Sequence, residues 1–277
     1  MPTRTACAGW VLAGLMILSA TPAGAASLQL DDLTWTEVRD GLRAGTTTVI
    51  IPVGGTEQNG PHMALGKHNV RAGVLSARIA GQLGHTLVAP VVAYVPEGNV
   101  SPPSGHMRFP GTISVPDDAF AAVVAAAARS LKQAGFLDVV LLGDSGNYQG
   151  QLKGIAQRLN REWAGSPARV HYVAAYYEAA TTDFAQALRA RGAGSQPGGT
   201  HAGVADTSLM MAIDASRVRA DRLRAADAAS PALGLGGDPG QASAALGQVG
   251  VDLVVDKTVA AIRQAIAARK PAANKER

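Results

Sequence analysis

The chain has 277 residues, of which 47% are hydrophobic and 17% charged, and its 25 Lys and Arg residues against 21 Asp and Glu residues give a formal net charge of +4. The apolar fraction is sufficient for a sizeable core, and the charged fraction is too low for a chain that stays disordered. The basic residues are spread along the chain without interleaved aromatic residues, so the composition gives no support to nucleic-acid binding.

The first 25 residues have the pattern of an export signal. Arg4 precedes an apolar run over residues 8–18, and Ala-Gly-Ala at residues 23–25 has the small-x-small pattern of a cleavage site. The run is shorter than the ~20 residues that span a bilayer. The single cysteine, Cys7, lies in this segment, so the mature chain has no thiol for disulfides, thiol catalysis or metal binding. We therefore expect a periplasmic or secreted chain that starts near residue 26 and binds no membrane after cleavage.

Short apolar runs alternate with helical patterns in the remaining chain. In order, the patterns predict strands at 48–53, 86–95, 139–142 and 170–175, and helices at 70–83, 117–135, 148–164, 207–213 and 252–268. The stretch 230–250, rich in Gly, Ala and Pro, is expected to form a surface loop, and residues 269–277 a disordered tail. Strands separated by helices favour a parallel sheet with helices on both faces. The predicted fold is one layered α/β/α domain over residues 26–268 with a mostly parallel central sheet.

Polar residues follow the predicted strands, where ligands bind in an open parallel sheet. They are Glu57, His62, His68, Asp144, His201 and Asp206. Carboxylates and imidazoles suit a divalent transition metal when thiols are absent, although Asp144 or Asp206 alone is equally suited to cap a helix. The sequence contains no G-x-S-x-G elbow, P-loop, G-x-G-x-x-G following a strand or H-E-x-x-H motif.

Several motifs, in the same order, resemble the creatininase (creatinine amidohydrolase) family. They are LTW at 33–35, IPVGGTEQNGPH at 51–62, FPGTIS at 109–114, LGDSGN at 142–147, HAGVADTS at 201–208 and GDP at 237–239. The resemblance implies a layered α/β fold, a homo-oligomer, and hydrolysis of non-peptide or peptide C–N amide bonds, often in rings, with two divalent metals. A shared family is weaker evidence for a shared activity.

Carried over position by position, the resemblance places five metal ligands. These positions hold Glu57, Asn59, His68, Asp144 and Asp206, where the family has Glu, His, Asp, His and Glu. His201 takes the position of a proposed proton-transfer residue, and Tyr177 that of a tryptophan that covers the substrate in creatininase. His106 and Glu178 are further candidate substrate contacts. His62 and Asn147 are expected to contact the metal ligands and hold them in place without binding the ion themselves.

The exchange of Asp for His68 and of His for Asp144 preserves a set of ligands for one ion. With Glu57 it leaves one imidazole and two carboxylates, which suits Zn²⁺ or Mn²⁺. A histidine cannot bridge two ions as a carboxylate can, and Asn59 is a weak neutral ligand. The sequence therefore favours one ion over two, with Asp206 as a further ligand that is one methylene shorter than the Glu of the family.

Three outcomes follow from this altered site. The leading hypothesis is a mononuclear amidohydrolase, in which the metal activates a water molecule and His201 passes a proton to the leaving nitrogen. The alternatives are a metal-free exported binding or scaffold protein and an altered two-metal site. Because the pocket and the ligands both depart from creatininase, we expect a small-molecule substrate other than creatinine.

Overall fold

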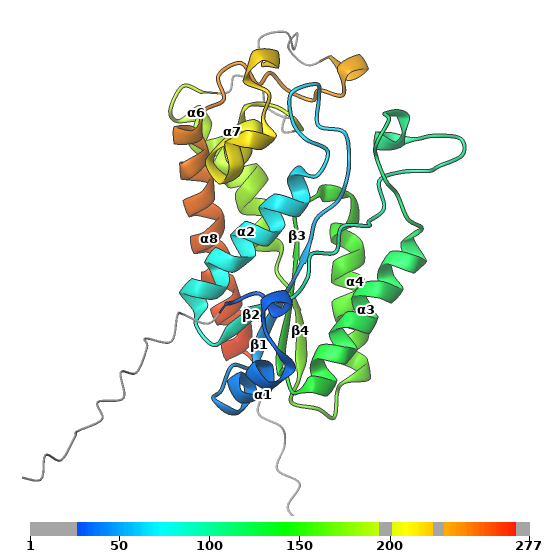
Figure 1. The fold of residues 1–277 in the computed structure, drawn as a ribbon, viewed down its shortest axis with the longest axis vertical. Coiled ribbons are helices and arrows are strands. Elements are labelled where there is room, and N and C mark those ends of the chain that lie inside the picture. Colours follow the sequence, from blue (N-terminus) through cyan, green and yellow to red (C-terminus); the bar gives the residue numbers. More distant parts are fainter. Residues whose placement is uncertain (1–26, 194–200, 224–229, 270–277) are drawn as a thin grey trace, which may run out of the picture.

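The computed structural model describes residues 27–193, 201–223 and 230–269, and its centre is a parallel β-sheet (Figure 1). The strands are β1 (Thr48–Val53), β2 (Thr86–Val88), β3 (Asp138–Gly143) and β4 (Arg169–Tyr172), in the order β2-β1-β3-β4. The predicted export signal lies outside the described residues, and so does the predicted tail beyond residue 269. The parallel sheet predicted from the alternating pattern is confirmed.

The apolar run of β1 forms a central strand because both of its faces are covered. All six of its residues are buried, and alternate side chains enter different cores. Ile50 packs in one core with Val140 of β3, whereas Val49 and Ile51 belong to the second core. A strand that is buried on both faces reads as a continuous apolar run. The register pairs Thr48 with Asp138 and Val53 with Gly143, so β1 and β3 end side by side.

Helices cover both faces of the sheet and complete three layers (Figure 1). One core contains side chains of α3 (Asp117–Ala134) and α4 (Gln149–Glu162). The other contains side chains of α2, of the run α5–α6, and of α7 and α8. Helix α2 comprises Lys67–Leu83, α7 comprises Val204–Asp214 and α8 comprises Ala244–Ala267. Helix α5 (Ala174–Glu178) continues through a π-helical turn (Ala179–Asp183) into α6 (Phe184–Arg189).

The start of α8 corrects the predicted loop at 230–250. The helix begins at Ala244, because the Ser243 side chain accepts a hydrogen bond from the Leu246 backbone and caps it. Gly247 then allows close packing, since a Cβ there would lie 1.8 Å from the backbone oxygen of Ser208 in α7. The glycines that indicated a loop therefore serve contact between two helices.

Other boundaries also differ from the prediction. Strand β2 ends at Val88 rather than at residue 95, and α2 begins at Lys67 rather than at residue 70. A further helix, α1 (Trp35–Arg43), begins at a capping box between Thr34 and Glu37, a signal that the prediction did not use.

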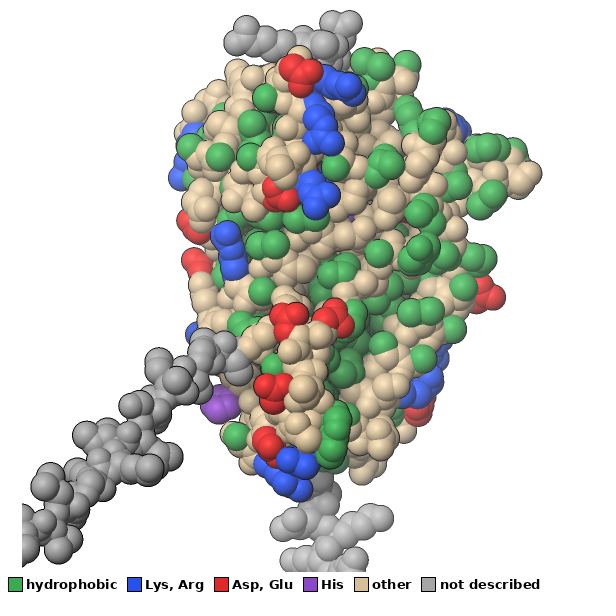
Figure 2. All heavy atoms as spheres, in the orientation of Figure 1, with side chains coloured by type: hydrophobic (Ala, Val, Ile, Leu, Met, Phe, Trp, Pro, Cys, Tyr) green, Lys and Arg blue, Asp and Glu red, His purple; other side chains and the backbone are tan. Residues whose placement is uncertain are grey.

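The surface carries an apolar groove of about 490 Å³ between α3 and the segment after β2. Its lining includes Pro90, Val92, Tyr94 and Val123, and hydrophobic side chains gather on this side of the molecule in Figure 2. Among the described helices, none combines the length and the apolar character needed to cross a membrane.

Candidate active site

A cavity of about 440 Å³ opens where the segments after β1, β3 and β4 meet. Its wall includes Glu57 after β1, Asp144 and Asn147 after β3, and Tyr177 after β4. His201, which precedes α7, also lines it. Polar residues distant in the sequence thus converge beyond the carboxyl ends of the parallel strands, as predicted from the fold class.

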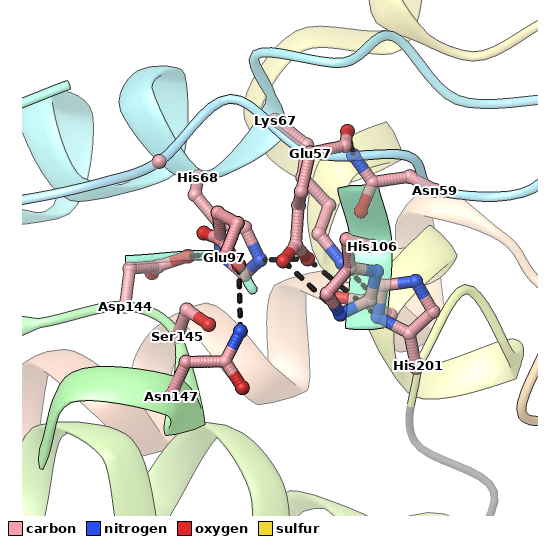
Figure 3. A network of polar contacts seen from close by, with 12 residues as sticks. Glu57, Asn59, Lys67, His68, Glu97, His106, Asp144, Ser145, Asn147 and His201 are labelled. Atoms are coloured by element: carbon pink, nitrogen blue, oxygen red, sulfur yellow. Dashed lines mark hydrogen bonds and ion pairs between the residues drawn. The ribbon is translucent and has the colours of Figure 1, made fainter. Parts of the chain in front are cut away.

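Glu57 is the buried carboxylate at the centre of this cavity. Its side chain is 1% exposed, and Oε1 accepts a hydrogen bond from Nε2 of His68 at 2.8 Å. The carboxyl of Glu97 also hydrogen-bonds to the Glu57 carboxylate and helps to lower the pKa of Glu57. Nε2 of His106 lies 3.3 Å from Oε2, and Nδ1 of His201 lies 3.6 Å from Oε1, so two imidazoles face the carboxylate (Figure 3).

Gln58 contacts both imidazoles on the side opposite Glu57. Its Nε2 lies 3.0 Å from Nδ1 of His106 and 3.0 Å from Nε2 of His201. Nε2 of His201 also lies 3.0 Å from the backbone oxygen of Gln58. These contacts fix the orientation of both rings. Because an amide nitrogen only donates, Nδ1 of His106 accepts and the neutral ring carries its proton on Nε2, so a metal at Nε2 requires the Gln58 amide to turn its oxygen towards Nδ1.

The donor set of Glu57, His106 and His201 fits one divalent metal ion. Among the described residues, these three form a group whose ligand atoms all lie within 4.8 Å of one another. The two imidazoles approach different oxygens of Glu57, with His106 3.3 Å from Oε2 and His201 3.6 Å from Oε1. Neighbouring ligand atoms of tetrahedral Zn²⁺ with bonds of about 2.0–2.1 Å lie about 3.3 Å apart, so the three side chains would draw together around an ion. Burial lowers the pKa of His106 and lowers that of His201 to about 4, which keeps both imidazoles neutral at pH 7, the state that binds metals.

The opposite wall of the cavity holds a cluster of buried charges. Arg71 donates from Nε at 2.9 Å and from its second terminal nitrogen at 2.6 Å to Oδ1 of Asp144, and it also forms an ion pair with Oδ1 of Asp206. Lys67 forms an ion pair with Oδ2 of Asp206. His68 contacts Asp144 through Nδ1. We call these five residues the charge cluster.

Within the charge cluster, each buried charged group is stabilised by neighbours of opposite charge. Burial alone would raise the pKa of Asp144, but Arg71 and His68 outweigh it and lower that pKa to about 2. In the same way Lys67 and Arg71 outweigh burial and hold the pKa of Asp206 well below its ordinary value. Burial alone would lower the pKa of His68, yet its contacts with Glu57 and Asp144 raise it.

The predicted ligands Glu57, His68 and Asp144 do not converge on one point. The two ring nitrogens of His68 contact different carboxylates, so Glu57 and Asp144 lie on opposite sides of the ring. Asn59 is fully buried, and its amide donates to the backbone oxygens of Glu57 and Ala64 at 2.8 and 3.2 Å. It therefore holds the loop that carries Glu57 and is not part of the cavity lining.

The other predicted site residues divide between the cavity and its surroundings. Tyr177, His106 and Asn147 line the cavity, whereas Glu178 does not. His62 is also outside the lining, and its Nε2 lies 2.9 Å from the hydroxyl of Thr207.

Glu97 is a functional candidate that the sequence analysis did not identify. It is buried, and Oε2 accepts a hydrogen bond of 2.6 Å from Asn147. Burial and the nearby charge of Glu57 raise the pKa of Glu97 to about 9, so this carboxyl is protonated at neutral pH. Glu97 thus orients a cavity residue without adding a negative charge beside Glu57.

Lys67 and Arg71 were also missed, although the sequence carries a signal for them. They lie four residues apart, and continuing the same spacing along α2 leads to Leu75 and Ile79, which are buried in the core. One face of α2 therefore carries basic residues at its start and apolar core residues further along. This pattern predicts that the two cations are buried next to the site.

The chain is similar in sequence to known proteins over most of its length. A family model described as creatinine amidohydrolase matches residues 31–262. The chain is 29% identical to the creatinine amidohydrolase of Pseudomonas putida over 126 residues, which are 46% of this chain and 47% of that protein. It is 29% identical to the mycofactocin precursor peptide peptidase of Mycobacterium ulcerans (strain Agy99) over 192 residues, 66% of this chain and 64% of that one. These matches span about half to two thirds of each relative.

Solved structures extend the similarity over most of the fold. A manganese form of creatininase has a TM-score of 0.72 and 26% identity, with 87% of this chain and 99% of that chain covered. A zinc–zinc form of a creatininase variant has the same TM-score, identity and coverage.

Proposed function

Because the chain belongs to the creatininase family, we propose that it is a hydrolase that cleaves a C–N amide bond in a small molecule with the help of one divalent ion. The family's members are hydrolases, and structures of creatininase itself hold manganese or zinc. We place the ion at Glu57, His106 and His201.

The observation that carries this proposal is the group of Glu57, His106 and His201, whose ligand atoms lie within 4.8 Å of one another at the cavity. Glu57 is buried, and a buried carboxylate is costly unless a cation or hydrogen-bond donors compensate its charge. The two neutral imidazoles beside it complete a set of two nitrogens and one oxygen. Such a set suits Zn²⁺ or Mn²⁺ and leaves a coordination position open, as in catalytic zinc sites.

The residues of the chain divide the remaining tasks. A bound ion would supply Lewis-acid polarisation of the amide carbonyl and a lowered pKa for water. Gln58 fixes the two imidazoles, and His201 serves as a ligand in this proposal rather than as the proton-transfer group that the resemblance implied. Asn147, held by Glu97, and the Tyr177 side chain offer hydrogen-bonding groups to a polar substrate in the cavity.

The volume and lining of the cavity support a small substrate. About 440 Å³ lies within the range of about 300–1,000 Å³ that is usual for small-molecule sites. Phe109 and Leu235 give the lining an apolar part in addition to its polar groups. A small cyclic amide or the end of a short peptide meets these requirements.

The test is hydrolysis of a panel of small cyclic amides and short peptides by the chain loaded with Zn²⁺ or Mn²⁺, read as release of the amine. We expect His106→Ala and His201→Ala each to lower kcat/KM by at least about 100-fold, because each removes a metal ligand. The matched control is His85→Ala, which alters an exposed histidine outside the cavity.

Either of two results would contradict the proposal. One is undiminished hydrolysis by the His106→Ala and His201→Ala variants, which would refute the ligand assignment. The other is specific binding of a panel compound without any turnover by the loaded chain, which would favour the exported binding protein.

A further inference from the structure

We infer that Lys67 and Arg71 replace a second metal ion: their side chains neutralise Asp144 and Asp206 within the fold, so that these two carboxylates take up no metal. The inference deepens the proposed function by limiting the site to one ion. It rests on the contacts of the charge cluster, and its test separates it from the proposal about Glu57.

Every oxygen of the two carboxylates already has a donor from the chain. Oδ1 of Asp144 accepts from Arg71, and Oδ2 accepts from the hydroxyl of Tyr176 at 2.7 Å. Oδ1 of Asp206 also pairs with Arg71. Oδ2 of Asp206 pairs with Lys67 and accepts from the backbone N–H of Ala202 at 2.9 Å.

The charges of this part of the cluster balance without an ion. Lys67 and Arg71 contribute two positive charges, and Asp144 and Asp206 contribute two negative ones. Burial makes this balance necessary, because a buried charge without a partner is strongly unfavourable. All four side chains are less than one tenth exposed. A divalent ion added between the carboxylates would leave two like-charged side chains beside it.

The cations cannot leave to make room for a metal without cost. Lys67 is 1% exposed and Arg71 is 4% exposed, and both project from the first two turns of α2, whose next turns pack in the core. Moving either head group away from its carboxylate would leave a buried cation unpaired. The anchoring of α2 therefore keeps both cations beside Asp144 and Asp206.

Their place relative to the family motifs supports the same conclusion. The resemblance assigns metal ligands to the positions of Asp144 and Asp206, and the zinc–zinc creatininase structure shows that relatives hold two ions. In this chain both positions hold carboxylates, although the family has a histidine at the position of Asp144, and α2 brings a lysine and an arginine against them. The positive charges of Lys67 and Arg71 thus lie beside positions at which relatives bind a metal ion.

The experiment counts bound ions in three forms of the mature chain. Each form is dialysed to equilibrium against Mn²⁺ and, separately, Zn²⁺, and the ions per chain are measured by inductively coupled plasma mass spectrometry. The forms are the wild type, the double variant His106→Ala/His201→Ala, which keeps the charge cluster, and the double variant Lys67→Met/Arg71→Met, which keeps the carboxylates. Circular dichroism checks that each form is folded.

We expect one ion in the wild type and none in His106→Ala/His201→Ala. Two ions in the wild type would overturn the inference. An ion that the histidine variant retains, and that is lost when Asp144→Asn is added, would overturn it as well. No ion in either form would refute the proposed metal at Glu57 and still agree with the inference, so the two failures are distinguishable.

The variant Lys67→Met/Arg71→Met tests the inference from the opposite direction. With its cations removed, the pair Asp144 and Asp206 should gain affinity for Mn²⁺, so we expect one ion more than in the wild type. We also expect that Mn²⁺ at a free concentration of 100 times its Kd raises the Tm of this variant by about 5–10 °C above that of the metal-free variant. A folded variant that binds no additional ion would count against the inference, and the wild-type count decides it if the variant does not fold.

Discussion

Replacing Arg71 by methionine removes the cation that joins the two carboxylates of the charge cluster. The side chain of Arg71 donates to Asp144 at 2.9 and 2.6 Å and pairs with Asp206, and it is 4% exposed. Methionine matches the arginine side chain as far as Nε and lacks the guanidinium carbon and its two terminal nitrogens, so the change removes the charge, the hydrogen bonds and part of the side-chain volume.

The expected cost follows from burial. Removing one partner of a buried ion pair costs about 3–5 kcal/mol, because it leaves the other charge uncompensated. Arg71→Met leaves Asp144 with His68 alone and Asp206 with Lys67 alone as ion-pair partners among the described residues. Domains of this size lose about 2–4 °C in Tm per kcal/mol, so we expect Tm to fall by about 6–20 °C.

The matched control is Arg129→Met. Arg129 also forms a two-point contact with a carboxylate, donating to Glu162 at 2.8 and 2.6 Å, but the two side chains are 47% and 42% exposed. Exposed pairs contribute no more than about 1 kcal/mol, so this variant should lose at most about 4 °C. Thermal unfolding followed by circular dichroism, with urea titration for the free energy, measures both. Equal losses in the two variants would refute the assigned role of Arg71.

Two further predictions concern Glu97 and the helix contact at Gly247. Because the pKa of Glu97 is raised to about 9 in the fold, its protonated form stabilises the fold at low pH, and this contribution is lost as the pH rises from about 4.5 towards 9. Glu97→Gln should therefore gain stability relative to the wild type over this range, by up to about 1.4 kcal/mol per pH unit in urea unfolding, and parallel pH profiles would contradict this. Gly247→Ala should cost at least about 1–3 kcal/mol, since its Cβ would meet the backbone of Ser208 at 1.8 Å. The control Gly154→Ala, with open space around an exposed helical position, should gain about 0.5–1 kcal/mol, and equal effects in the two glycine variants would contradict the close contact.

The parallel sheet and the location of the site at one edge of it could be predicted from the sequence. The run at 48–53 and the segments between strands follow local rules, and parallel strands bring Glu57 and Asp144 to one edge. The start of α8 was not predictable in this way, because Gly247 resembles a loop residue until α7 is placed against it. Tertiary contact outweighed the local glycine signal there.

The partners of each site residue depended on the same long-range contacts. His68 and Asp144 were expected to share an ion, yet in the fold they contact each other, and Lys67 and Arg71 from the first two turns of the same helix pair with Asp206. His106 lies in a segment between β2 and α3, and no periodicity fixes where such a segment places a side chain. Its position beside Glu57 became visible only in the folded chain.

The most direct test of the account is the position of the metal in crystals of residues 26–277 grown with Zn²⁺, located by anomalous scattering at the zinc edge. The account predicts a single peak per chain, bonded to Glu57, His106 and His201, with Lys67 and Arg71 still paired with Asp206 and Asp144. A peak bonded to Asp144 or Asp206 would contradict it.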